Sequence, residues 1–173
     1  FNTEAVRDSE IKVIKNYTEK DILNYLNSLT NIVEQTVRSQ FDTLNQKEMG
    51  PETVVASQLI FAQSIQSLKN IAVPSPLIKP QKAILQALNN QKRIAEAVAN
   101  YENDPAKILL IAQEDVDKIV NRDIQNFIDE LEKSSGLEAT SVREKNFLIA
   151  FIEKIFIVNR ARAIIGIGGI GPE

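Results

Sequence analysis

The sequence predicts an all-α protein, an elongated up-down bundle of four to five long helices. The first observation behind this prediction is the placement of helix breakers: apart from Gly50, Gly136 and the C-terminal tail, the chain has no glycine, and its prolines are confined to a few points. Helix interiors tolerate both residues least, so these points mark helix boundaries. The second is that the stretches between them carry apolar residues at spacings of three and four. Roughly 70% of the chain is then helical, about twice the average.

The composition indicates a single helical-bundle domain over residues 1–173. Hydrophobic residues make up 43% and charged residues 25%, and the net charge is −3 with acids and bases interleaved, so no attraction to nucleic acid is expected. The chain contains no cysteine and no histidine, which removes disulfides, thiol catalysis and the usual zinc and di-iron ligand sets. No apolar run reaches the ~18–20 residues of a membrane span. We therefore expect no metal and no cofactor.

The N-terminal arm, residues 1–17, leads into the first helix. Within it, Ile11–Ile14 fits either a short strand or an early helical turn. Thr18–Asp21 resembles a capping box and predicts a helix from Thr18 to Gln46. The apolar stripe of this helix comprises Ile22, Leu26, Leu29, Val33, Val37, Phe41 and Leu44.

The next two helices are bounded by prolines. Pro51 suits the first position of a second helix, predicted over Pro51–Ile71. Val73–Pro76 should be extended, because a residue before proline is pushed away from the helical region. Pro80 is expected in the first turn of a third helix. Its buried face should carry Ile84, Leu88, Ala95 and Val98.

Two further helices complete the predicted bundle. Asp104-Pro105 is a start signal for the fourth helix, which Gly136 closes, and Ser141–Glu144 is a capping box for a fifth that runs to about Ala163. The fifth helix is apolar over most of its circumference, so we expect it at the centre of the bundle. Short connections between helices one and two, and three and four, favour antiparallel neighbours. The core should depend on Phe127, Leu131, Phe151 and Ile155.

Two proline motifs carry a family resemblance. Val73–Pro76 precedes one predicted helix and Asn103–Pro105 precedes the next. On these motifs, residues 73–112 resemble a group of uncharacterised secreted helical proteins of small-genome bacteria. The resemblance covers under a quarter of the chain and implies no activity; it implies an extracytoplasmic or secreted location.

Motifs that elsewhere carry chemistry lack their required context. The acidic cluster Glu114–Asp117 is followed by Ile119 and Val120 where a calcium loop needs an oxygen ligand and glycine, so it is predicted to be a solvated helix face. Gly166–Gly171 matches a dinucleotide-binding pattern but follows a helix and not a strand. Ser9–Lys12 matches a serine acyl-enzyme motif without its companion motifs. No catalytic residue is assigned, and we expect no enzymatic activity.

Two segments instead suggest contact surfaces. The second helix carries no charge between Thr53 and Leu68. Small uncharged polar residues suit a close approach of helices or a polar contact surface. A helix largely enclosed within its own bundle explains the pattern equally well. The Gly/Ile-rich tail, residues 166–173, should dock in a groove of the bundle or on a neighbouring molecule, with a membrane surface the less favoured host. The candidate contact residues are Thr53, Ser57, Ser64, Ser67, Ile164, Ile165, Ile167 and Ile170.

The function these patterns favour is a non-enzymatic structural or protein-interaction bundle, extracytoplasmic or part of a larger assembly, with a protein partner or a second copy. The alternative is an extracytoplasmic sensor that holds a small molecule between its helices. A third hypothesis is membrane association through the tail. A convergent cluster of buried polar residues would favour the sensor, and a large exposed apolar surface would favour the assembly role.

Overall fold

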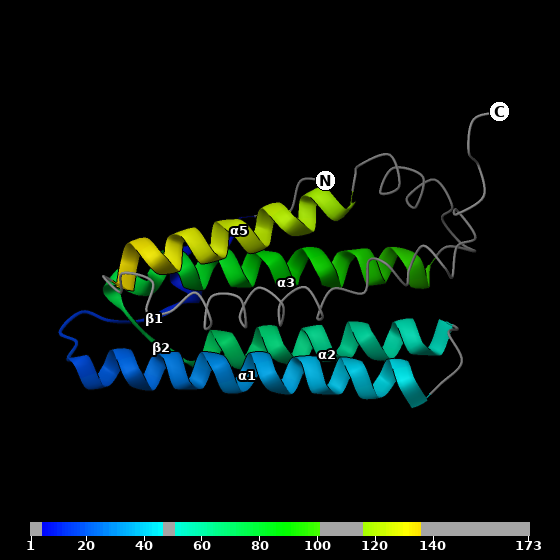
Figure 1. Cartoon of the computed structure of the whole chain (residues 1–173), viewed down its shortest axis with the longest axis horizontal. Coiled ribbons are helices and arrows are strands. Elements are labelled where there is room, and N and C mark those ends of the chain that lie inside the picture. The colour runs from blue at the N-terminus through cyan, green and yellow to red at the C-terminus, as the bar shows by residue number, and fades with distance from the viewer. Residues whose placement is uncertain (1–4, 47–50, 101–115, 136–173) are drawn as a thin grey trace.

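The computed structural model describes residues 5–46, 51–100 and 116–135, and this part of the chain is mostly helical (Figure 1). Four helices pack against one another, together with two short 3-10 helices and a small two-stranded parallel sheet. In chain order the elements are η1 (Asp8–Glu10), β1 (Lys12–Ile14), α1 (Glu19–Gln46), α2 (Pro51–Asn70), β2 (Ala72–Pro74), η2 (Ser75–Leu77), α3 (Ile78–Ala99) and α5 (Val116–Ser135).

The described helices are neighbours in the order in which they follow one another along the chain. α1 packs against α2, α2 against α3, and α3 against α5, while η2 also contacts α5. The colour gradient in Figure 1 shows that each helix runs opposite to the one before it. None of the described helices is both long and apolar enough to cross a membrane. The predicted fifth helix, over residues 141–163, lies outside the described residues, and so does the Gly/Ile-rich tail.

The start of α1 follows from the predicted capping box. The Thr18 backbone N–H donates to Asp21 Oδ2 at 2.7 Å, and the Asp21 N–H donates to Thr18 Oγ1 at 3.3 Å. Each residue thus satisfies a backbone donor that the first turn of a helix leaves free. The hydrogen bonds from Thr18 also hold the pKa of the Asp21 carboxyl below its ordinary value.

The buried face of α1 is rotated away from the predicted apolar stripe. Leu29 and Val33 lie in the core as predicted, but Phe41, assigned to the same stripe, is 63% exposed. Tyr25, which the stripe omitted, is only 1% exposed. Farther along, the buried positions of α1 are Thr36 and Gln40. The prediction for Phe41 was therefore wrong, because polar residues of α1 take the positions that face α2.

The arm and the α2–α3 connection form the parallel sheet, an element outside the predicted all-α class. The register pairs Lys12 with Ala72 and Ile14 with Pro74. Of the two alternatives for Ile11–Ile14, the strand is the one observed. Val73 and Pro74 of the predicted extended segment belong to its partner strand, whereas Ser75 and Pro76 form η2, so the extended prediction was wrong for those two residues. Val6 and Ile11 of the arm are buried in the core (the same cluster as α1, α2, α3 and α5), so the arm is packed onto the helices.

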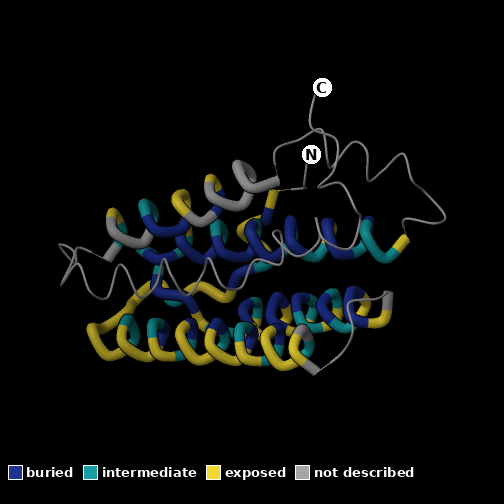
Figure 2. The backbone as a smooth tube through the Cα atoms, turned by 45° about the vertical axis from the view of Figure 1, so that its right-hand side comes forward, coloured by how far each residue is buried: buried dark blue, intermediate teal, exposed yellow. Residues whose placement is uncertain are grey.

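α3 is the most enclosed of the described helices. It begins at Ile78, and Pro80 is buried in its first turn, as predicted. The predicted residues Ile84, Leu88 and Ala95 are buried, and Figure 2 shows burial along much of α3, whereas α1 is exposed along its outer side. Eleven of its 22 residues are buried. The central position predicted for residues 141–163 is thus held by α3 within the described part.

The main core joins all four helices. The almost fully buried members of this core are Phe61 and Leu68 of α2, Leu77 of η2 and Leu85 of α3. Phe127 of α5 belongs to the same cluster, as predicted. The Leu131 side chain, Phe151 and Ile155, also predicted for the core, lie outside what the structure describes.

We predict that Phe61→Ala destabilises the fold by ~3–5 kcal/mol, because Phe61 is 1% exposed and its removal leaves a cavity among packed helices. The matched control is Phe41→Ala, which removes the same side chain from a site that is 63% exposed and should change stability by only about 0.5 kcal/mol. Chemical denaturation of both variants measures the difference. Equal losses of stability would contradict this placement of the α1 face.

Candidate functional site

Polar side chains are buried between α1 and α2, at the position of the charge-free run. Thr36 Oγ1 and Ser64 Oγ lie 2.7 Å apart. Each hydroxyl also lies within hydrogen-bond distance of a backbone carbonyl one turn earlier, Ile32 O at 2.7 Å for Thr36 and Ile60 O at 2.8 Å for Ser64. The two hydroxyls have only two protons for these three contacts, so at any moment one of the three contacts is not a hydrogen bond.

A second polar contact joins the same two helices nearer their connection. Gln40 Nε2 donates to the Ser57 carbonyl oxygen at 3.1 Å. Gln40 Oε1 and Ser57 Oγ are buried and, among the described residues, have no hydrogen-bond partner. Unsatisfied buried polar atoms cost stability, so the polar contact at this end of the α1–α2 packing is incomplete among the described residues.

The buried side chain of Gln81 in α3 forms hydrogen bonds with both α1 and α2. The Tyr25 hydroxyl donates to Gln81 Oε1 at 3.0 Å, and Gln81 Nε2 donates to the Leu68 carbonyl at 2.7 Å. That carbonyl lies in the last turn of α2 and also accepts a hydrogen bond from the Ile71 backbone N–H at 3.3 Å. Burial raises the pKa of Tyr25, so its hydroxyl remains a neutral donor. Gln81 therefore links α1, α2 and α3.

On its other side, α3 meets α5 through an amide and a carboxylate. Asn90 Nδ2 donates to Asp123 Oδ2, and Arg122 lies 3.3 Å from the other carboxylate oxygen. Gln86 Nε2 donates to Asn90 Oδ1 at 3.3 Å. Asp123 is buried, and burial of a carboxylate is tolerated only when its oxygens are paired in this way. Periodicity gave no signal for these residues, since all four are polar.

The sequence-predicted contact residues separate into two groups. Thr53, Ser57 and Ser64 are buried within the helix packing, whereas Ser67 is exposed. The structure brings Ser64 and Ser67 together on one groove between α1 and α2, of about 50 Å³, a volume suited to water and too small for an organic ligand. Ile164, Ile165, Ile167 and Ile170 lie outside the described residues.

Around this groove lies an exposed surface without charge, which we call the uncharged face. Its exposed members are Asn31 and Gln35 of α1 and Leu59, Gln63 and Ser67 of α2. Gln35, Gln63 and Ser67 line the groove itself, so the two helices present one continuous surface there. Leu59 lies one turn from Gln63 and is 59% exposed. Sequence reasoning found only the α2 half, through its lack of charge.

A larger cleft lies where the arm crosses α2 and α3. It has a volume of about 360 Å³. It is bounded by Ala5, Val6, Glu10, Lys69, Asn89, Lys92, Arg93 and Glu96. The lining is dominated by charged groups from three separate segments, and sequence spacing could not have brought them together. Within the described residues, no three Asp or Glu side chains are grouped to hold a metal.

Ion pairs hold the arm against this cleft. Lys69 Nζ contacts Glu10 Oε2 at 2.5 Å, and Lys82 pairs with Asp8. Lys12 Nζ donates to Asn70 Oδ1 at 3.1 Å. The hydrogen bond from Lys69, together with that from the Arg7 backbone N–H, holds the pKa of Glu10 below its ordinary value of 4.5.

Comparison with known proteins adds no relative. No family model matches the chain, and no curated protein or solved structure is significantly similar to it. The function is therefore inferred from the geometry of the chain itself.

We predict that Ser64→Lys destabilises the fold strongly, because it places a charge in the buried contact with Thr36. Ser67→Lys is the matched control: it makes the same change on the same helix at an exposed position and should leave stability within about 0.5 kcal/mol. Thermal melts at low protein concentration measure both. A stable Ser64→Lys variant would mean that the α1–α2 contact is open to solvent.

We predict that Glu10 stabilises the fold only while it is ionised. Its folded-state pKa lies below the ordinary value of 4.5, so its contribution is complete above pH 4.5 and is lost as the pH falls through the folded-state value. The difference in unfolding free energy between the wild type and Glu10→Gln should shrink over that window. In a Lys69→Gln background the difference should be small at every pH. A wild-type advantage that is independent of pH would contradict the Lys69–Glu10 pairing.

Proposed function

We propose that this chain is a non-enzymatic protein-interaction module, an elongated up-down bundle of four to five helices that associates with a second copy of itself. The observation that carries the proposal is the uncharged face. α1 has no charged residue from Ile22 to Val33, and α2 has none from Thr53 to Leu68. A helix surface in contact with water normally carries lysine and glutamate, so exposed surface without charge needs another explanation.

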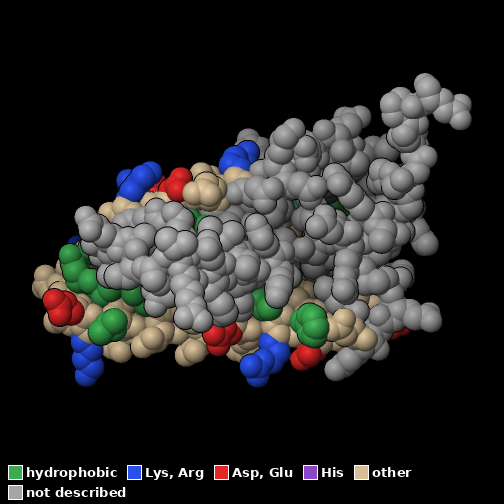
Figure 3. All heavy atoms as spheres, viewed as in Figure 1, with side chains coloured by type: hydrophobic (Ala, Val, Ile, Leu, Met, Phe, Trp, Pro, Cys, Tyr) green, Lys and Arg blue, Asp and Glu red, His purple; other side chains and the backbone are tan. Residues whose placement is uncertain are grey.

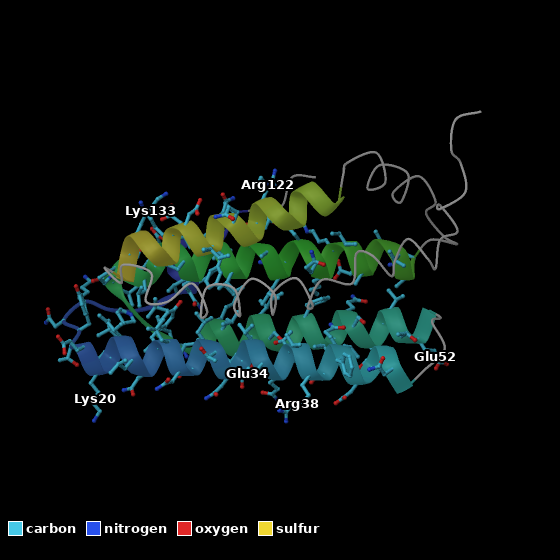
Figure 4. The ribbon with its side chains drawn as sticks, in the orientation of Figure 1. Lys20, Glu34, Arg38, Glu52, Arg122 and Lys133 are labelled. Carbon is cyan, nitrogen blue, oxygen red and sulfur yellow. The ribbon has the colours of Figure 1, made fainter. Side chains whose placement is uncertain are left out.

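The composition of the uncharged face supports a protein as its occupant. Its centre consists of Gln35, Gln63 and Ser67 around the groove, with the apolar Leu59 beside them. Charges stand at its edge: Glu34 and Arg38 project from α1 away from the other helices (Figure 4). A centre depleted of charge inside a charged rim is the usual composition of a protein interface.

A second copy is the occupant that this chemistry suits best. Each glutamine and asparagine amide is both a donor and an acceptor, so the face can form hydrogen bonds with an identical face. A two-fold dimer brings the same surface together from both subunits, and a charged surface would then repel itself. Two copies of the uncharged face would meet without this electrostatic repulsion.

The buried polar residues support this role over the small-molecule sensor. The Thr36 and Ser64 hydroxyls and Gln40 Nε2 are engaged with one another or with backbone carbonyls inside the α1–α2 interface, and the groove above Thr36 and Ser64 has only about 50 Å³ of space. Leu23 and Phe41 of α1 are also exposed, but they lie on the flank of α1 opposite to the uncharged face, and Figure 3 shows hydrophobic side chains exposed along α1. An extracytoplasmic location, implied by the resemblance of residues 73–112, completes the proposal.

We predict that the wild type forms a dimer whose mass falls to that of a monomer in Gln63→Lys. The substitution places two like charges opposite each other in a two-fold contact, while Gln63 is exposed and its replacement should leave the monomer folded. Light scattering coupled to size exclusion measures the mass, and circular dichroism checks the fold. A wild type that remains monomeric at high concentration would refute the proposal.

The matched control is Thr30→Lys, an exposed position on the opposite flank of α1, between Leu23 and Phe41. It should leave the dimer intact. If Thr30→Lys dissociates the dimer and Gln63→Lys does not, the contact is through the Leu23–Phe41 flank. If Gln63→Lys lowers the melting temperature of a monomeric wild type, a segment of the same chain covers the face, and the self-association proposal fails.

A further inference from the structure

The outer side of α2 carries a line of residues that the packing on α1 and α3 leaves uncovered. Val55, Leu59, Ala62 and Gln66 follow one another at alternating spacings of four and three, so they lie along one side of the helix. Val55 is 45% and Leu59 59% exposed, Gln66 is exposed and Ala62 is half-buried. We call these four residues the outer stripe. It shares Leu59 with the uncharged face and adds the exposed apolar Val55 to it.

The apolar part of this surface belongs to α2 and not to α1. On α1, the side that adjoins the uncharged face presents the exposed amides Asn24, Asn31 and Gln35. The exposed apolar residues Leu23 and Phe41 lie on the opposite flank of α1. The residues that contribute most to an interface lie near its centre, where charge is depleted and apolar area is buried. The centre of a contact through this surface is therefore the outer stripe of α2.

A two-fold axis can place the outer stripe against itself in two directions. In a parallel pair, each residue lies opposite the same residue of the partner. In an antiparallel pair centred on the midpoint of α2, Leu59 lies opposite Ala62 of the partner and Val55 lies opposite Gln66 of the partner, and symmetry repeats both contacts. This antiparallel register pairs α2 over its whole length.

From this geometry we infer that the second copy docks antiparallel along α2, with Leu59 of each copy packed on Ala62 of the other. The inference rests on the self-association proposed above and adds to it the helix, its direction and its register. A large side chain opposite a small one lets two helices approach closely and interdigitate. A parallel pair would instead place leucine against leucine and alanine against alanine, which alternates a crowded contact with a gap.

The charged residues at the two ends of the outer stripe also favour the antiparallel direction. Glu52 lies one turn before Val55 at the start of α2 (Figure 4), and Lys69 lies one turn after Gln66 at its end. Both already interact within their own chain, Lys69 with Glu10, so neither is counted as an attraction. A parallel pair nevertheless brings each of them opposite a like charge, whereas the antiparallel register does not.

The experiment is disulfide trapping in the full chain, which contains no cysteine of its own. The double variant Val55→Cys/Gln66→Cys is oxidised at a concentration at which light scattering shows a dimer, and the linked peptides are identified by mass spectrometry. Within one helix the two positions are roughly 16 Å apart, too far for a disulfide, so a bond between them joins two chains. We expect bonds from position 55 of one copy to position 66 of the other to dominate over bonds between identical positions.

A matched pair of leucine variants tests the same contact without cysteines. Leu59→Ala should weaken dimerisation by about tenfold or more, because it removes two symmetry-related contacts at the centre of the interface. Leu23→Ala makes the same change at a site of α1 that is 60% exposed, against 59% for Leu59, and should leave the dimerisation constant unchanged. Both side chains are exposed in the single chain, so the melting temperature at low protein concentration should be similar for the two variants.

The outcomes separate this inference from the proposal on which it rests. Bonds between identical positions would show a parallel pair, and a dimer without bonds between chains would show that α2 is not the contact. Equal weakening by Leu59→Ala and Leu23→Ala would show that the outer stripe is not its centre. Each of these results overturns the inference and leaves self-association standing. A monomeric wild type refutes self-association and this inference together.

Discussion

The enclosure of α3 between α2 and α5 is the constraint on which the other contacts depend. A helix buried on two sides must satisfy any polar side chain it carries, and α3 carries Gln81 and Asn90 among its buried residues. Gln81 is 0% exposed and is satisfied only if Tyr25 of α1 and the end of α2 both approach it. Asn90 likewise requires Asp123 of α5. The position of α3 thus restricts the placement of the three other described helices, since a misplaced helix would leave a buried amide unpaired.

The same enclosure fixes the arm and hence the cleft. The connection between α2 and α3 is short and contains Val73 and Leu77, both fully buried, so it cannot move away from the core. β2 lies within that connection, and it is the strand to which β1 of the arm is paired. Two strands of three residues are too few to be stable alone. The arm is therefore held by the burial of its own Val6 and Ile11 in the core and by its ion pairs to Lys69 and Lys82.

Sequence periodicity and capping chemistry located α1, α2 and α3 because these signals are local, whereas the predicted helix start at Asp104-Pro105 lies outside the described residues. Thr18 and Asp21 lie three residues apart, and Pro51 stands at the helix start that it predicts. Periodicity does not decide which of two adjacent faces is buried, and for this reason Phe41 was assigned to the core in place of Tyr25. The partners of Gln81 and Asn90 are 56 and 33 residues away, so only the fold reveals that these amides are buried. The same reasoning explains why the cleft, built from three segments, had no signature in the sequence.

The absence of charge in α2 has two different physical causes on its two sides. On the inner side, Thr53, Ser57 and Ser64 are buried, and a charged residue at any of them would have to be desolvated without a partner. Burial therefore explains the lack of charged residues on the inner side of α2. On the outer side, Leu59, Gln63 and Ser67 are exposed, where lysine or glutamate would carry no such cost. Solvent contact would permit charge there and helix packing does not forbid it, so burial does not account for this half, and the proposed contact with a second copy would.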